Sequence, residues 1–294
     1  MRVFKDRLAK RTMLVLSVVP AFLVGLILVG LFIRARPILA EKPFFSLFFS
    51  SAWSPLKGEF GLLPFIMGTL WVTLVSLVLA VPVSLLTAIY LSEYSPRPVR
   101  EFTKPIIDLL AGLPSVIYGV WGVLLIVPLV GRVIAPLFGV TSSGYTILAG
   151  GIVLAIMILP TIISVSLEVF SSIPYPMREA SLSLGATKWE TVQNVVLKKG
   201  LQGIIAAVVL GLSRAFGETM AVLMVVGNIP RLPKSVFDGG YPLPALIANN
   251  YGEMMSVPLY DAALMLAAAV LLLVVLFFNV LARLILIRVE RRSA

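Results

Sequence analysis

Residues 174–190 have the sequence PYPMREASLSLGATKWE, and this polar stretch decides the fold because it separates two long apolar runs. Pro174 and Pro176 cannot continue the helix expected before them, whereas Pro176 fits the first turn of a new helix. A short helical run over residues 177–184 follows and stops at Gly185, since glycine readily adopts the left-handed conformation that ends helices. We therefore predict a short helix with a sharp stop.

A second helix is predicted directly after this stop. Thr187, with Glu190 three residues later, forms the capping-box pattern that begins a helix. Apolar residues at positions 189, 192, 195 and 196 then fall on one face of it. The resulting helix–glycine–helix hairpin is either an amphipathic element on a bilayer surface or a docking element for a partner. Physical reasoning alone leaves both interpretations open.

The composition places the rest of the chain in a lipid bilayer. Of the 294 residues, 59% are hydrophobic and 13% are charged, about half the charged share of a soluble domain. This excludes a soluble enzyme and a disordered chain. Cysteine and histidine are absent, which excludes disulfides, thiol nucleophiles, Cys/His metal sites and a histidine acid or base. For a transport subunit we also expect no catalytic residue and no cofactor. The net charge of +10 favours an anionic membrane surface over nucleic acid.

Six runs are long enough to span a membrane as helices. They cover residues 12–33, 65–91, 106–130, 147–170, 201–226 and 260–287. The runs are continuous rather than alternating, which argues against a β-barrel. We predict an all-α polytopic membrane protein with an N-terminal anchor helix and external loop (1–64), a transmembrane core (65–287) that includes the hairpin at 174–200, and a basic tail (288–294). The first run is too long for a cleaved signal peptide, so we predict an uncleaved anchor.

The distribution of basic residues predicts the orientation of the chain. With the N-terminus inside, the inner segments carry fifteen lysines and arginines, and the outer segments carry seven. We therefore expect a multi-pass protein of the cell membrane with both termini in the cytoplasm. The hairpin would then be cytoplasmic, and residues 34–64, 131–146 and 227–259 would lie outside.

The fifth run contains a charged pair. Arg214 lies at its midpoint, where an arginine costs about 2.5–3.5 kcal/mol to insert. Glu218 lies four residues on, and in a continuous helix the two side chains share a face and can pair. The pair is either a structural ion pair or an anion station on a translocation path, and intramembrane charges favour the second interpretation. Gly203, Ala207, Gly211 and Ala215 form a ladder of small residues, which predicts close helix packing here.

The third run opens with Ala111-Gly112-Leu113-Pro114-Ser115, a sequence that weakens a helix. A packing kink is the favoured interpretation, and a broken helix lining a cavity is the alternative. Ser115 and Thr219 join Arg214 and Glu218 as candidate residues of a substrate pathway. The first outer loop is rich in aromatic residues, which fits an interfacial belt, a short interfacial helix or a contact with a binding protein.

The hairpin resembles the "EAA…G" loop of ABC-importer permeases. Glu179, Ala180 and Gly185 match the pattern, while Ser181 and Lys198 depart from it. In that family the hairpin fits a groove of the ATPase subunit, which assigns Glu179, Ala180, Leu184 and Gly185 to ATPase coupling. The chain has no phosphate-binding loop of the G-x-x-x-x-G-K-[ST] type, so any ATP must be hydrolysed on another chain.

Further stretches between residues 53 and 228 resemble PstC-type permeases of phosphate-specific ABC importers. They are residues 53–55, 60–61, 68–70, 88–94, 111–119 and 214–222. The resemblance implies the type I ABC importer permease fold, import of inorganic phosphate, and a link of Arg214 and Glu218 to phosphate passage. It also implies three kinds of protein partner: a second permease subunit, two ATP-binding subunits and an external phosphate-binding protein. The whole complex would lie in the lipid bilayer.

Two alternatives stay open at this point. One arginine does not distinguish tetrahedral anions, so the cargo could be another oxyanion such as molybdate or sulfate. More distantly, the chain could be an ATP-independent anion channel or carrier, in which case the hairpin would have no partner.

Overall fold

The computed structural model describes residues 2–253 and 256–293 and is almost entirely helical. Six of the described helices are long and apolar enough to cross a membrane: Ala9–Glu41, Leu63–Tyr94, Ser115–Leu137, Ile147–Ser172, Lys188–Gly217 and Tyr260–Arg288. Each of the six predicted runs corresponds to one of these helices. The prediction of an all-α polytopic protein is therefore confirmed.

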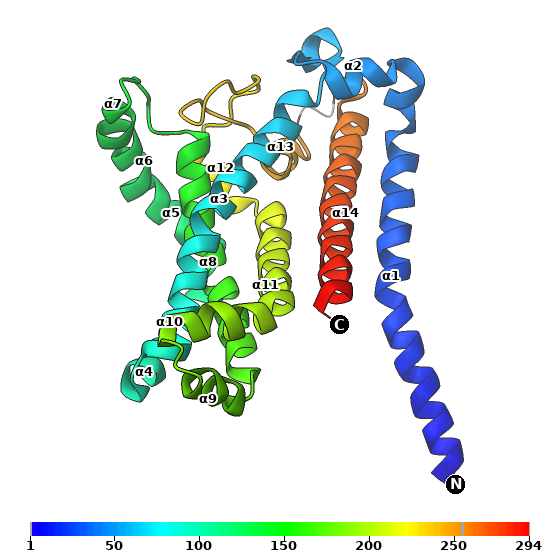
Figure 1. The fold of residues 1–294 in the computed structure, drawn as a ribbon. Coiled ribbons are helices and arrows are strands. Elements are labelled where there is room, and N and C mark those ends of the chain that lie inside the picture. The colour runs from blue at the N-terminus through cyan, green and yellow to red at the C-terminus, as the bar shows by residue number, and fades with distance from the viewer. Residues whose placement is uncertain (1, 254–255, 294) are drawn as a thin grey trace.

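Helix α8 (Ile147–Ser172) is the centre of the fold. It packs against α3 (Leu63–Ile89) on one side and α11 (Leu197–Gly217) on another, as Figure 1 shows. Helices α1 (Arg2–Glu41) and α14 (Tyr260–Ser293) lie side by side at the edge of the molecule. The apolar surface of α1 is largely exposed, as expected for a helix that faces lipid.

The predicted ladder of small residues lies in the contact between α11 and α8. A Cβ atom added to Gly211 would come within 2.8 Å of the Ile162 side chain, and one added to Gly203 would collide with Val169. Ala207 is fully buried between the helices. The ladder therefore brings the two helices close together, as predicted.

The predicted third span, residues 106–130, is wrong in its position. Residues 106–112 belong instead to α4 (Arg97–Gly112), an amphipathic helix outside the spans, and a new helix begins with α5 (Ser115–Trp121). It continues through η3 (Gly122–Ile126), α6 (Val127–Leu129), η4 (Val130–Ile134) and α7 (Ala135–Leu137). Leu113 is extended because the ring of Pro114 disfavours a helical conformation before it. The sequence 111–115 thus separates two helices rather than kinking one.

The predicted fifth span, residues 201–226, is also interrupted. Its helix begins earlier, with α10 (Lys188–Thr191) and η5 (Val192–Val196), and α11 ends at Gly217. Glu218 is extended, and the short helix α12 (Met220–Val225) follows. Residues 214 and 218 are therefore not on one continuous helix.

The hairpin forms as predicted. Helix α9 (Tyr175–Ser183) ends before Gly185, which has φ +87°. Both capping-box hydrogen bonds join Thr187 and Glu190. Figure 1 shows α4, α9 and α10 at one end of the molecule, and α1 begins and α14 ends on that same side. This arrangement agrees with the predicted topology, in which the hairpin and both termini share a side.

The opposite end carries short elements. They are α2 (Phe44–Phe49), β1 (Trp53–Ser54), η1 (Pro55–Lys57), β2 (Glu59–Phe60) and α13 (Leu243–Asn250). At the hairpin side, η2 (Tyr90–Tyr94) continues α3. The aromatic loop thus contains a short helix with exposed Phe44 and Phe45. Trp53 and Phe60 instead pack into the protein, where Trp53 contacts Phe65 edge-on. An interfacial belt therefore explains only part of this aromatic set.

Candidate functional site

Arg214 connects three helical segments at the middle of α8. Its Nη1 donates to Thr161 Oγ1 at 2.9 Å, and its Nη2 donates to the Ala111 carbonyl at 3.2 Å. Ala111 is in the last turn of α4, whose terminal carbonyls have no partner within their own helix. A cation is stabilised at such a helix end. These two bonds reduce the cost of placing a guanidinium among the spans.

Glu218 does not pair with Arg214. Its Oε1 accepts a hydrogen bond from the Ala221 backbone N–H at 3.1 Å and so caps the start of α12. Among the described residues, the one salt bridge joins Arg178 and Glu93. The structural ion pair, one of the two alternatives for these residues, therefore does not form, because Gly217 ends the helix that would have placed both side chains on one face.

The other candidate pathway residues lie at the two helix breaks. Ser115 begins α5, and Thr219 lies between α11 and α12 with its hydroxyl toward the Gly217 carbonyl at 3.4 Å. Tyr118, which the sequence did not single out, spans the first break by donating to the Leu110 carbonyl at 2.7 Å. Arg214 therefore lies close to both helix breaks. Its side chain reaches the Ala111 carbonyl just before the break at Leu113–Pro114, and its own helix ends one turn later, at Gly217.

Thr161 was also missed in the sequence. The available signal was a series of polar residues along the apolar helix α8, at positions 161, 164, 168 and 171. This spacing of three and four residues keeps them on one helical face. A polar stripe on a central spanning helix is a feature that composition alone does not reveal.

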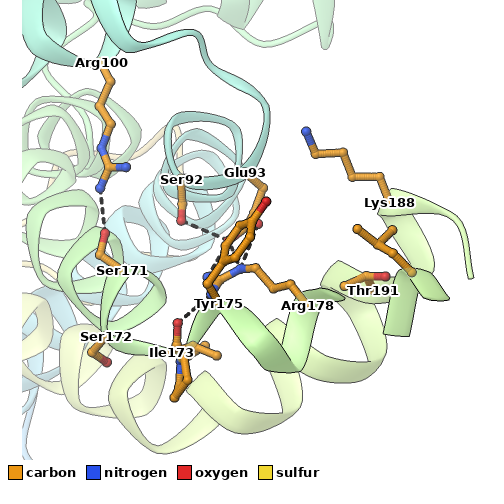
Figure 2. A pocket seen from close by; sticks show the side chains of 12 residues that line it. Ser92, Glu93, Arg100, Ser171, Ser172, Ile173, Tyr175, Arg178, Lys188 and Thr191 are labelled. Atoms are coloured by element: carbon orange, nitrogen blue, oxygen red, sulfur yellow. Dashed lines mark hydrogen bonds and ion pairs between the residues drawn. The ribbon is translucent and has the colours of Figure 1, made fainter. Parts of the chain in front are cut away.

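A second site lies at the base of the hairpin, and Figure 2 shows it from close by. Arg178 of α9 makes a paired contact with Glu93 of η2, with Nη2 at 2.8 Å from Oε1 and Nε at 3.2 Å from both carboxylate oxygens. Its Nη1 and Nη2 also donate to the carbonyls of Ile173 and Phe170 at 2.6 and 2.7 Å. One side chain therefore joins the hairpin to the ends of α3 and α8.

This contact is shielded from solvent. The side chains of Arg178 and Glu93 are 12% and 9% exposed, so water screens the pair only weakly. The pair borders a cavity of about 800 Å³ that also includes Arg100, Lys188, Ser92 and three further hydroxyl residues, Ser171, Ser172 and Thr191. Three cations, Arg100, Arg178 and Lys188, thus line one opening.

The predicted coupling residues lie on the outer surface of the hairpin. Glu179, Ala180 and Gly185 are exposed, and the Leu184 side chain is 89% exposed. An apolar side chain at the tip of a polar turn has no packing role in its own chain. The hairpin is therefore anchored through Arg178 and presents the other four residues outward.

Comparisons with known proteins agree with this architecture. Residues 80–292 match the family described as "Binding-protein-dependent transport system inner membrane component". The "Phosphate transport system permease protein PstC" of Xylella fastidiosa (strain 9a5c) is 40% identical over 262 residues, which cover 84% of this chain and 80% of the relative. The "Phosphate transport system permease protein PstC 2" of Mycobacterium tuberculosis is 37% identical over 280 residues, 89% of this chain and 86% of the relative.

Solved structures show the same fold. A chain of a bacterial alginate ABC transporter in complex with an alginate-bound periplasmic protein aligns with a TM-score of 0.63 and 19% identity, covering 96% of both chains. A chain of the inward-facing MetNI methionine ABC transporter aligns with a TM-score of 0.60 and 19% identity, covering 78% of this chain and 95% of that chain. At these identities the likeness concerns the fold alone.

Proposed function

Because the chain belongs to the family of inner-membrane components of binding-protein-dependent transport systems, we propose that it is the permease subunit of an ATP-driven importer of inorganic phosphate. The chain is a multi-pass membrane transport component and not an enzyme, since its relatives are permease proteins. The phosphate transport permeases among these relatives support phosphate as the cargo.

One observation carries the proposal at the level of residues. The Arg214 guanidinium is held between α8, α11 and the end of α4 at mid-span, by a hydroxyl and a carbonyl that leave its charge uncompensated. A carboxylate partner would neutralise this charge, whereas Glu218 is engaged in capping α12. The part-exposed guanidinium keeps donors for a passing anion. In this proposal, Glu218, Thr219 and Ser115 shape the two helix breaks beside it.

Membership of the family implies ATPase and substrate-binding partners. We infer a finer arrangement: a second permease subunit beside this one, two ATP-binding subunits, and a phosphate-binding protein on the outer loops. The exposed face of the hairpin, Glu179, Ala180, Leu184 and Gly185, then contacts an ATP-binding subunit. In this arrangement both termini lie in the cytoplasm, and the complex lies in the cell membrane.

The contacts of Arg178 suggest how ATPase closure reaches the spans. A partner that moves α9 pulls on Glu93 at the end of α3 and on the last carbonyls of α8 through one guanidinium. The same hairpin continues without a break into α11, which carries Arg214. Hydrolysis of ATP on the partner would thus alter the access of Arg214 to the two sides of the membrane.

The test uses the assembled complex with its binding protein, reconstituted in vesicles. Arg214→Gln should leave co-purification of the subunits intact and reduce phosphate uptake at least about 100-fold, as expected when a charge-assisted contact of some 3 kcal/mol is lost. The matched control is Arg283→Gln, which removes another arginine of a spanning helix, near the end of α14. Normal uptake by the Arg214 variant would refute its role, and uptake of sulfate or molybdate in place of phosphate by the unmodified complex would refute the cargo.

A further inference from the structure

The polar stripe of α8 faces a second stripe on α4. Thr161, Ser164, Glu168 and Ser171 share one face of α8, and the neighbouring positions Ile163 and Leu167 are buried against Ile107 of α4. On α4, Arg100, Lys104 and Asp108 are spaced four residues apart and therefore lie on one face of that helix. The two helices pack along this seam.

Hydrogen bonds fix both ends of the seam. At the inner end, Arg100 Nη2 donates to Ser171 Oγ at 2.6 Å, a contact visible in Figure 2. At the mid-span end, Arg214 donates to Thr161 and to the Ala111 carbonyl. Consecutive cations therefore follow the seam from Arg214 through Lys104 to Arg100, toward the side of the molecule that carries the hairpin.

A separate cavity opens between these two ends. It measures about 220 Å³ and is lined by Arg100, Lys104, Ile107, Asp108, Ser164, Leu167, Glu168 and Ser171. A water molecule takes up about 30 Å³ in the liquid, so the cavity holds an anion of five heavy atoms with part of its hydration. Six of the eight lining residues are charged or carry hydroxyl groups. Lys104, Asp108, Glu168 and Ser171 among them are exposed, so the cavity is polar and open between α4 and α8.

We propose that this cavity is a second phosphate station, on the inner side of Arg214, at which phosphate is held before release. Arg100 and Lys104 supply the positive charge, and the hydroxyl of Ser164 donates a hydrogen bond to a phosphate oxygen. Ser171 positions Arg100 instead, since its hydroxyl accepts from the guanidinium and donates to the Leu167 carbonyl. This inference rests on the proposed function, because it names a further site for the same cargo.

The two carboxylates of the cavity determine how tightly the station binds and which anion it accepts. Asp108 and Glu168 offset the charges of Arg100 and Lys104, so an anion bound next to the two cations is held weakly enough to leave, as a conduction site requires. Phosphate keeps one or two hydrogens at neutral pH and can donate them to a carboxylate, which only accepts. A fully deprotonated tetrahedral anion such as sulfate has no hydrogen to donate and would leave both carboxylates repelling it.

The test compares the reconstituted complex with its Lys104→Gln and Arg100→Gln variants, using labelled phosphate on both sides of the vesicle. We expect each variant to lower the maximal uptake rate about tenfold, while the external phosphate concentration for half-maximal uptake stays unchanged because the binding protein sets it. We also expect phosphate trapped inside the vesicles to inhibit uptake less in the variants than in the unmodified complex. The control is Arg97→Gln, an exposed cation on the first turn of α4 outside the cavity.

The outcomes separate this inference from the proposed function. If the unmodified complex imports phosphate and both cavity variants match it in rate and in inhibition from inside, the inner station is refuted and the proposed function stands. If the unmodified complex imports no phosphate at all, the proposed function itself fails. A Ser171→Ala variant removes the hydrogen bond from Arg100 while keeping the charge of Arg100, so it should retain most of the internal inhibition. Internal inhibition lost as fully in Ser171→Ala as in Arg100→Gln would show that the loss does not depend on the charge, and it would refute the station.

Discussion

Replacing Arg178 by alanine should release the hairpin from the rest of the molecule. The substitution removes the contact with Glu93 together with the bonds to the carbonyls of Ile173 and Phe170. Those groups lie beneath α9, and Glu93 is 9% exposed. The variant therefore leaves one nearly buried carboxylate with only the Ser92 hydroxyl as a donor, and it removes the guanidinium from two helix-end carbonyls.

The magnitude follows from this burial. Removing one partner of a buried ion pair costs about 3–5 kcal/mol, because the other charge stays desolvated. The slight exposure of both side chains places this pair at the lower end, at about 3 kcal/mol. Since about 1.4 kcal/mol corresponds to a factor of ten, the detached population of α9 should rise roughly a hundredfold. The cost falls on the docking of the hairpin and not on the spans, whose contacts are unchanged.

Hydrogen exchange measured by mass spectrometry on the purified complex tests this directly. Backbone amides of residues 175–183 should exchange about a hundredfold faster in Arg178→Ala, while those of residues 147–170 keep their protection as an internal control. A double variant, Arg178→Met with Glu93→Leu, replaces the pair by apolar groups and should restore most of the protection. Unchanged exchange in the single variant would refute the anchoring role of Arg178, and failure of the double variant to recover would refute its electrostatic origin.

Two glycine substitutions probe the hairpin turn and the helix ladder. Gly185→Val should uncouple ATP hydrolysis from uptake, because a backbone φ of +87° costs a branched residue about 1–2 kcal/mol. The control is Gly185→Asn, which should keep the coupling because asparagine tolerates this conformation better. Equal coupling in both variants would contradict the argument. Gly211→Ala should lower the free energy of unfolding of the complex by about 1–3 kcal/mol, seen as a lower melting temperature, because the added Cβ would lie 2.8 Å from the Ile162 side chain. Gly25→Ala, with open space around it, is the matched control, and a similar loss in both would show that packing against α8 is not the cause.

The sequence predicted those parts of the fold that depend on local chemistry. Apolar runs located six spanning helices, and the prolines, Gly185 and the capping box of Thr187 located the hairpin. These predictions succeed because each of these structures depends on interactions between residues that are close in the sequence. The resemblance to ABC-importer permeases added the assignment of the exposed hairpin residues.

The misplaced features depend on contacts between distant segments. An apolar stretch around Pro114 is equally compatible with a kink and with two helices, and only the packing of α4 against α8 decides between them. Arg214 finds its partners in Thr161 and Ala111, which lie 53 and 103 residues away in the sequence. The sequence around Arg178 contains no signal for its partner Glu93, which lies 85 residues earlier.

The uninterrupted helix from Lys188 to Gly217 has a mechanical consequence. At 1.5 Å per residue, its 30 residues form a stiff rod about 45 Å long, with the hairpin turn at one end and Arg214 within one turn of the other. A tilt imposed at the hairpin end therefore moves Arg214, with no loop between them to absorb the motion. The π-helical segment η5 (Val192–Val196) lies near the hairpin end of this helix. A small change of its geometry would change the direction of the helix and would displace the far end most.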